Sequence, residues 1–319
     1  MIFLGLGFGA GSRDSEERHE ERIFPTGYAT GRNPHLASRL FAPFAPRFST
    51  HVRRHSVNGI TLARIVEIAD RLFPFDQAES WDNIGLQIGD PHAIINAVAF
   101  SLDPTPQTIR FAADNSCGLL ITHHPLFPEP LRSITSETLT GRTALDSAKF
   151  GVAVLSLHTN LDAANGGLND HLAGSLGLTG IRAPEPARCA RMGELPQSTG
   201  LWALARRVAD VFQTRNVRVV ARKDVQVHRV FLASGSGMSY LPDALRFRAD
   251  VMVTGDVRYH AAREAVEMGM PVIDAGHYGL EKAAVGLLHG RFREEFLSLD
   301  LKVSCVPCAV EDEPYQLLL

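Results

Sequence analysis

The chain contains no long apolar run. None of its 319 residues lies in a stretch that approaches the ~20 consecutive apolar residues a helix needs to cross a bilayer, so we expect no membrane span. The apolar opening at residues 2–10 is interrupted by glycines and lacks a basic region before it, which argues against a signal peptide. The absence of both signals predicts a cytoplasmic protein.

Cysteine is scarce, with 4 in the whole chain, which excludes a disulfide framework. Cys305 and Cys308 form a CxxC pair, but no second pair completes a zinc site and no βα context supports a redox motif. The neighbouring apolar residues Leu301, Val303 and Val306 predict a buried terminal strand. We therefore interpret both cysteines as buried structural thiols.

A large excess of charge of one sign is also missing. The 32 basic and 35 acidic residues give a formal net charge of −3 at pH 7, so no global field draws the chain to nucleic acid or to an anionic membrane. We expect neither as a partner. Hydrophobic residues make up 45% of the chain, which suits one large or two modest domains with a full core.

Residues 1–58 differ from the rest of the chain. They carry a cluster of acidic and basic residues between Asp14 and Arg22 and show no sustained periodicity, which predicts a disordered extension. The acidic residues argue against an organelle transit peptide. After Met1 the next methionine is Met192, so a shorter product would need a non-methionine start codon. A genuine extension and a misplaced start would both produce this pattern.

From Gly59 onward, strand-like apolar segments alternate with amphipathic helical segments, and Thr61 is expected to cap the first helix. We predict strands at 94–102, 118–122, 152–157, 229–233, 251–254, 271–274 and 301–306. We predict further helices near 106–115, 137–150, 168–176, 201–212, 241–247, 258–268 and 280–296. This alternation is typical of an α/β protein with a largely parallel sheet covered by helices.

The chain also repeats itself weakly. Segment 110–122 resembles segment 246–254, and segment 151–162 resembles segment 269–281. In both of the latter segments a strand is followed by a histidine, and a carboxylate comes four residues after it. Two echoes in the same order predict two related α/β lobes whose strand ends line a shared cleft.

Polar side chains gather where the predicted strands end, which is where ligands bind in open α/β sheets. His123 and His124 follow a hydrophobic strand, and Pro125 stops that strand. His277 and Glu281 lie four residues apart at the start of a predicted helix, so they can share one face. Taken alone, the first pair could be two surface histidines and the second an ordinary hydrogen-bonded pair.

Asp162 follows another strand end, where its carboxylate could also cap the next helix. With it, the set holds three imidazoles and two carboxylates, which suit zinc, iron, manganese or cobalt rather than calcium. Five ligands suffice for two divalent metal ions if one carboxylate bridges them, and two such ions would support hydrolytic chemistry. Residues that could orient the ligands or carry protons lie at matching strand ends: Asp103, His158, Asn160, Asp256 and His260.

Four motifs connect the chain to a known family. They are WDNIGLQIG at 81–89, THHPL at 122–126, HTNLD at 158–162 and DAGHYGLE at 274–281. Their order and spacing resemble the Nif-three-like family, whose members are often described as GTP cyclohydrolase I type 2 homologues. The resemblance runs from about residue 59 to the C-terminus and implies the short form of the family, without a domain inserted between the lobes.

The resemblance also implies a metal site and an assembly. His124 and Asp162 would hold one ion, His123 and His277 the other, and Glu281 would bridge them. The assembly would be a ring-shaped homo-hexamer.

The function that the resemblance implies is GTP ring opening, with release of formate and formation of dihydroneopterin triphosphate. The ligand would then be a nucleotide-like small molecule, although the chain has no GxxxxGK[ST] phosphate loop. One alternative is a non-catalytic metal-binding protein that regulates or handles metal, and another is a metal-dependent phosphoesterase. A coordination position open to water would favour an enzyme, whereas full occupancy by protein ligands would favour the binder.

Overall fold

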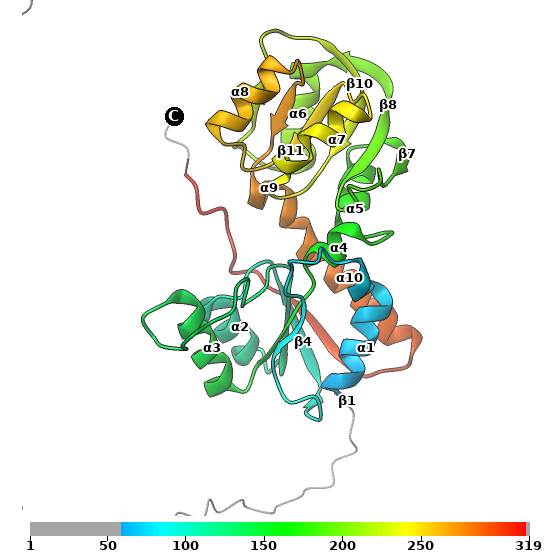
Figure 1. Cartoon of the computed structure of the whole chain (residues 1–319). Coiled ribbons are helices and arrows are strands. Elements are labelled where there is room, and N and C mark those ends of the chain that lie inside the picture. Colours follow the sequence, from blue (N-terminus) through cyan, green and yellow to red (C-terminus); the bar gives the residue numbers. More distant parts are fainter. Residues whose placement is uncertain (1–58, 317–319) are drawn as a thin grey trace, which may run out of the picture. The chain divides into compact units, whose positions relative to one another are not determined.

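The computed structural model describes residues 59–316, so the extension predicted at 1–58 lies outside the described residues. Within that part, none of the helices combines the length and the apolar character that crossing a membrane requires. Two larger sheets organise the described chain (Figure 1). Two short strands, β1 (Ile60–Thr61) and β3 (Ile94–Ile95), form a separate antiparallel ribbon.

The first sheet has five strands in the order β13-β4-β5-β6-β2. Strands β13, β4, β5 and β6 run parallel, and β2 pairs antiparallel with β6. The bounds are β2 (Gly85–Ile88), β4 (Ala97–Ser101), β5 (Leu119–Thr122), β6 (Ala153–Ser156) and β13 (Ser304–Pro307). Every residue of β4, β5 and β6 is buried, as expected for parallel strands covered on both faces.

Three of the helices in this part of the chain, α1, α2 and α3, begin at threonine caps. Thr61 accepts a hydrogen bond from the Arg64 amide and starts α1, as predicted, and Thr105 and Thr108 form a capping box at α2. The bounds are α1 (Leu62–Leu72), α2 (Pro106–Asp114), α3 (Leu139–Phe150), α4 (Thr159–Ala163) and α5 (Leu168–Ser175), with a short 3-10 turn at Phe75–Gln77.

The second sheet has six strands in the order β7-β8-β10-β11-β12-β9. Strands β10, β11 and β12 are parallel, whereas β7, β8 and β9 pair antiparallel with their neighbours. The bounds are β7 (Thr179–Arg182), β8 (Arg191–Gly200), β9 (Arg218–Val220), β10 (Gln226–Leu232), β11 (Val251–Thr254) and β12 (Val272–Asp274). The prediction of a largely parallel sheet is therefore right for the first sheet and wrong for this one.

The antiparallel strands of the second sheet were not predicted, because none of them is a continuous apolar run. Strand β8 contains Gly193 and Pro196, and most of its second half is exposed. The remaining elements are α6 (Leu201–Val211), a 3-10 turn at Gly237–Tyr240, α7 (Leu241–Arg246), α8 (Tyr259–Glu267), α9 (His277–Glu281) and α10 (Ala283–Ser298).

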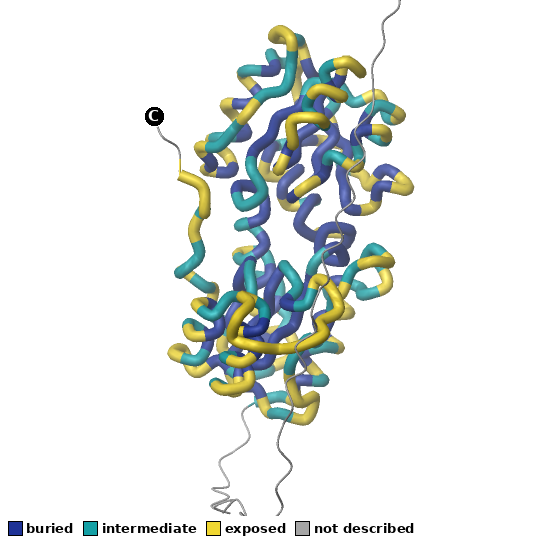
Figure 2. Tube along the Cα trace, turned by 60° about the vertical axis from the view of Figure 1, so that its left-hand side comes forward, coloured by how far each residue is buried: buried dark blue, intermediate teal, exposed yellow. Residues whose placement is uncertain are grey.

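The two repeated segments contain the same order of elements. The first runs through α2, β5, α3, β6 and α4, and the second through α7, β11, α8, β12 and α9. After α9 the chain returns along α10, which packs against β4 and β13 of the first sheet (Figure 1). One hydrophobic cluster contains Phe100 of β4, Val230 of β10 and Phe292 of α10. Figure 2 shows the buried residues in the interior of the trace and most exposed residues at its outside.

Two expected elements differ in detail. The expected strand at 94–102 is divided into β3 and β4, and the expected helix at 280–296 is divided into α9 and α10. The prediction of buried thiols at Cys305 and Cys308 is wrong, since both are only partly buried. The reason is that β13 lies at the edge of its sheet and has a neighbour on one side only.

Candidate metal centre

His123 and His124 follow the C-terminal end of β5, which lies between β4 and β6. Their rings turn toward opposite neighbours: Nδ1 of His123 lies 3.0 Å from the carbonyl oxygen of Leu157, after β6, and Nδ1 of His124 lies 2.7 Å from Oδ1 of Asp103, after β4. Both partners are oxygen acceptors, so each Nδ1 carries a hydrogen and donates it outward, which leaves each Nε2 facing the cluster. The position between two parallel strands thus orients both rings.

His277 and Glu281 come from α9, which starts directly after β12. Gly276 has a φ of 77°, a conformation that favours glycine, and it turns the chain from the strand into the helix. Nδ1 of His277 lies 2.8 Å from Oδ2 of Asp256, so it donates outward and its Nε2 faces the cluster.

The short helix places its carboxylate between two imidazoles. Oε2 of Glu281 lies 2.7 Å from Nε2 of His277 and 2.9 Å from Nε2 of His124. These two nitrogens are 3.3 Å apart. Two ring nitrogens and a carboxylate oxygen this close together could hold a cation between them.

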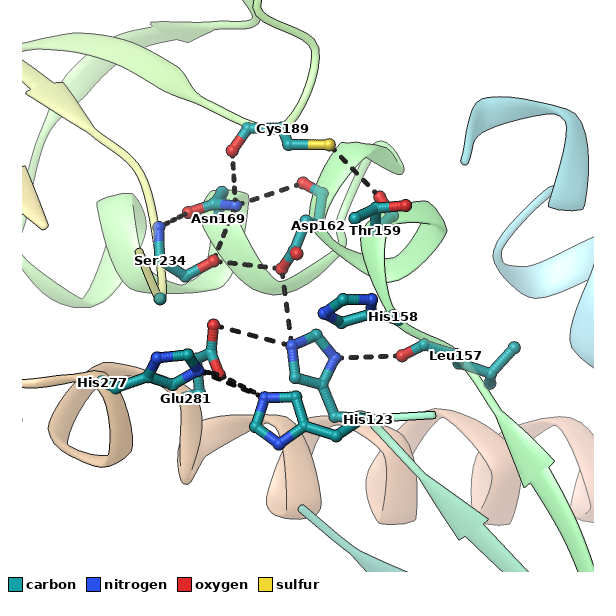
Figure 3. A network of polar contacts seen from close by, with 12 residues as sticks. His123, Leu157, His158, Thr159, Asp162, Asn169, Cys189, Ser234, His277 and Glu281 are labelled. Carbon is teal, nitrogen blue, oxygen red and sulfur yellow. Dashed lines mark hydrogen bonds and ion pairs between the residues drawn. The ribbon is translucent and has the colours of Figure 1, made fainter. Parts of the chain in front are cut away.

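His123 and Asp162 lie on the other side of the same carboxylate. Nε2 of His123 is 3.8 Å from Oε1 of Glu281 and 3.9 Å from Oδ1 of Asp162 (Figure 3). It is fully buried and has no hydrogen-bond partner among the described residues. A buried nitrogen left without a partner costs ~1–3 kcal/mol. A metal ion between this nitrogen and the two carboxylates would satisfy it.

A fourth imidazole, that of His158, lies beside His123 (Figure 3). One ligand-type atom from each of His123, His124 and His158 lies within 4.8 Å of the others. Nδ1 of His158 is 2.9 Å from Oδ1 of Asp82, so His158 too is held through its outer nitrogen. Asp82 was not predicted, and the only signal for it is its place in the motif at 81–89.

All four rings thus follow one pattern. Each offers its Nδ1 hydrogen to a carboxylate or carbonyl oxygen outside the cluster, which is how proteins orient metal-ligating histidines. The inner atoms are imidazole nitrogens and carboxylate oxygens, which suit zinc, iron or manganese. The five residues predicted as ligands are therefore brought together in a form that fits divalent transition-metal ions.

The charges of the cluster support the same conclusion. Burial alone would lower the pKa of His124, but its contacts with Asp103 and Glu281 outweigh burial and raise the pKa to about 10. For His277, contacts with Glu281 and Asp256 likewise outweigh burial and raise the pKa to about 9. Burial opposes the ionised form of Glu281, yet the surrounding imidazoles hold its pKa well below the ordinary value. The cluster therefore attracts positive charge.

The predicted supporting residues have different positions. Asp103, Asp256 and His158 belong to the cluster. Asn160 instead donates a 2.8 Å hydrogen bond to the carbonyl oxygen of Phe73, and His260 packs edge-on against Tyr259.

Two further supporting residues, besides Asp82, were missed. Ser234 donates a 3.1 Å hydrogen bond to Oδ1 of Asp162, and the Asn169 side chain contacts both Ser234 and the Asp162 carbonyl oxygen (Figure 3). Serine and asparagine in loops and helices are too common for sequence to single these two out.

The structure groups the predicted ligands differently from the pairing that the resemblance implies. His124 lies beside His277, and His123 lies beside Asp162. The reason is the opposite turn of the two adjacent rings. His123 faces the side of β6, after which Asp162 follows in α4, and His124 faces the side of β4.

Comparisons with known proteins identify relatives of this chain. The chain is similar to proteins described as "GTP cyclohydrolase 1 type 2 homolog": one from Clostridium acetobutylicum is 29% identical, covering 79% of this chain and 97% of the relative. Another from Methanocaldococcus jannaschii is 32% identical, covering 75% of this chain and 96% of the relative.

Solved structures share the fold. Reduced HcgD from Methanocaldococcus jannaschii superposes with a TM-score of 0.67 at 29% identity, covering 79% of this chain and 98% of that one. The Bacillus cereus protein related to NIF3 has a TM-score of 0.77 at 21% identity, covering 82% of this chain and 99% of that one. The family model described as Duf34/NIF3 (NGG1p interacting factor 3) matches residues 60–314, which confirms the resemblance seen in the motifs. The chain belongs to the Duf34/NIF3 family.

Proposed function

We propose that the chain binds two divalent transition-metal ions and hydrolyses a nucleotide-like substrate, with GTP ring opening as the leading candidate. The observation that carries the proposal is the convergence of the imidazole Nε2 atoms on Glu281, each ring fixed from outside by an oxygen acceptor. The names of the curated relatives supply the candidate substrate.

The grouping of the side chains supports a division of the ligands. His124, His277 and Oε2 of Glu281 would hold one ion, and His123, Asp162 and Oε1 of Glu281 would hold the other. Zinc, iron and manganese all suit this set. When bound, two such ions lower the pKa of water and stabilise charge on substrate oxygens.

The remaining polar residues have separable tasks. Asp103 and Asp256 are engaged with the ligands His124 and His277, so they act as positioning residues. His158 is held by Asp82 and points its other nitrogen toward the cluster, which makes it the best placed of the three predicted candidates to carry a proton.

A cavity of about 800 Å³ opens beside His124 and His277. Sites for small molecules commonly measure ~300–1,000 Å³, so a nucleotide fits. Its wall includes Arg215 and Tyr278, a cation for an anionic group and an aromatic ring for a base. These residues support a nucleotide-like substrate.

The decisive test is incubation of the metal-loaded protein with GTP, followed by measurement of formate and dihydroneopterin triphosphate. Wild-type protein should release both, and His123→Ala should abolish release without unfolding the chain. His260→Ala is a matched control, because His260 lies outside the cluster. No product with zinc, manganese or iron, from protein that retains its metal, would reject the cyclohydrolase assignment.

One observation favours a second candidate. His158 lies close enough to His123 and His124 to supply a further ligand atom. If it fills the position that a water would need, the site becomes a closed metal-binding centre, as in a regulatory or metal-handling protein. Replacement of His158 by alanine would then weaken metal binding. If His158 instead carries a proton, the same variant would lose turnover and keep its metal.

A further inference from the structure

The segment that follows β13 is hydrogen-bonded to the end of β4, next to the proposed metal centre. The two carboxylate oxygens of Glu311 accept hydrogen bonds from the backbone amides of Leu102, at 2.9 Å, and Asp103, at 2.8 Å. The Tyr278 hydroxyl donates to the carbonyl oxygen of Glu311 at 3.0 Å. Glu311 therefore joins the C-terminal segment to the end of β4 and to the residue after His277.

The same two residues, Leu102 and Asp103, also make hydrogen bonds with His124. The carbonyl oxygen of Leu102 accepts a 2.9 Å hydrogen bond from the His124 amide. The side chain of Asp103 accepts the His124 ring hydrogen at Nδ1, over 2.7 Å. Two independent contacts thus lead from Glu311 to one proposed ligand, one through the backbone and one through the ring. None of the residues involved is close in sequence to Glu311.

The segment also forms part of the cavity. Residues 310–316 line it opposite His124 and His277. Past Glu311 the segment is largely exposed, with Tyr315 at 74% exposure, so few contacts other than those of Glu311 keep it in place. Release of Glu311 would free this wall and the strand end together.

We propose that Glu311 is a positioning residue of the metal centre: by fixing Leu102 and Asp103 it sets the orientation of His124, and it holds segment 310–316 as the outer wall of the cavity. The inference rests on the proposed metal binding. A ligand ring whose outer contact is loosened should bind its ion more weakly, typically 10- to 100-fold when such a contact is removed entirely. Glu311 acts one contact further out, so we expect its removal to weaken metal affinity ~10-fold, and only for the ion that His124 holds.

The test is titration of full-length protein with Co²⁺, followed by its visible absorption spectrum, and amide hydrogen exchange. Glu311→Ala should bind one of two ions ~10-fold more weakly, with an altered spectrum for that ion, and the amides of Leu102 and Asp103 should exchange faster. Glu294→Ala is the matched control, because that glutamate is exposed on α10 and lies outside the cavity lining. Glu311→Gln keeps one carbonyl acceptor and should recover part of the affinity.

Wild-type affinity and spectrum in Glu311→Ala, despite faster exchange of the two amides, would overturn the positioning role. If the alanine variant does not fold, the glutamine variant would do the same by showing faster exchange of the two amides with wild-type affinity and spectrum. A wild-type chain that binds no Co²⁺ would reject the proposed function and this inference together. That failure is distinguishable from a failure of this inference alone. Neither wild type nor variant would then bind Co²⁺, but the amides of Leu102 and Asp103 would still exchange faster in the variant.

Discussion

Replacement of Glu281 by glutamine tests the centre most directly, because this carboxylate touches every group of proposed ligands. Its side chain is 4% exposed and lies 2.7 Å from His277, 2.9 Å from His124 and 3.8 Å from His123. Glutamine keeps the volume and removes the charge, so no cavity forms. The shared ligand would lose one anionic oxygen, and we expect both ions to be released on dialysis.

The magnitude for the metal-free protein follows from two close contacts. Hydrogen bonds to charged groups contribute ~1.5–3 kcal/mol each, so the substitution should lower the free energy of unfolding by ~3–6 kcal/mol at neutral pH. The pKa of Glu281 is depressed, so its contribution exists above the ordinary carboxyl pKa of 4.5 and disappears as the pH falls through its lower folded value. The difference between variant and wild type should therefore shrink in acid.

Metal content by elemental analysis and urea unfolding in the presence of a chelator measure the two effects. Glu264→Gln is the control, because that glutamate is exposed on α8. Two ions retained per chain in Glu281→Gln would remove the bridging role, and an unchanged unfolding free energy would show that the carboxylate does not hold the imidazoles as described.

Four further predictions concern the same site and the assembly. His124→Ala should weaken mainly one of the two ions, and equal loss of both in equilibrium dialysis would contradict the proposed division. Burial would lower the pKa of both rings, but carboxylate contacts outweigh it and raise the pKa of His124 to about 10 and that of His277 to about 9. A metal ion must displace these protons, so the apparent metal affinity should rise between pH 6.5 and 9, ~10-fold per pH unit for each proton displaced. A metal affinity that stays constant from pH 7 upward would refute this. By the same shifts, the stability that protonated rings give the metal-free protein is fully present below pH 6.5 and should be lost as the pH rises through 9 to 10, which melting curves in chelator can follow. We also propose a homo-hexamer, and light scattering that shows a stable monomer at micromolar concentration would reject it.

Much of the fold could be predicted because it depends on local patterns. The buried strands β4, β5 and β6 are short apolar runs that end in polar residues, and Thr61 caps its helix through a contact three residues away. The strands that were missed, such as β8, carry glycine, proline and exposed polar residues. They form because a neighbouring strand offers its free edge, and that partner is not visible in the segment itself.

The five proposed ligands were identifiable from sequence because each lies just after a strand or in the short helix that follows one, and because the repeated segments contain the same histidine–carboxylate spacing. Sequence alone determined which residue types could meet. Only the tertiary structure decided how they meet: β5 lies between β4 and β6, so the rings of His123 and His124 turn to opposite sides. It also brought Asp82, Ser234 and Glu311 to the centre from distant parts of the chain. Those contacts depend on hydrogen bonds between segments up to 209 residues apart, whose spacing in sequence carries no signal of their distance in space.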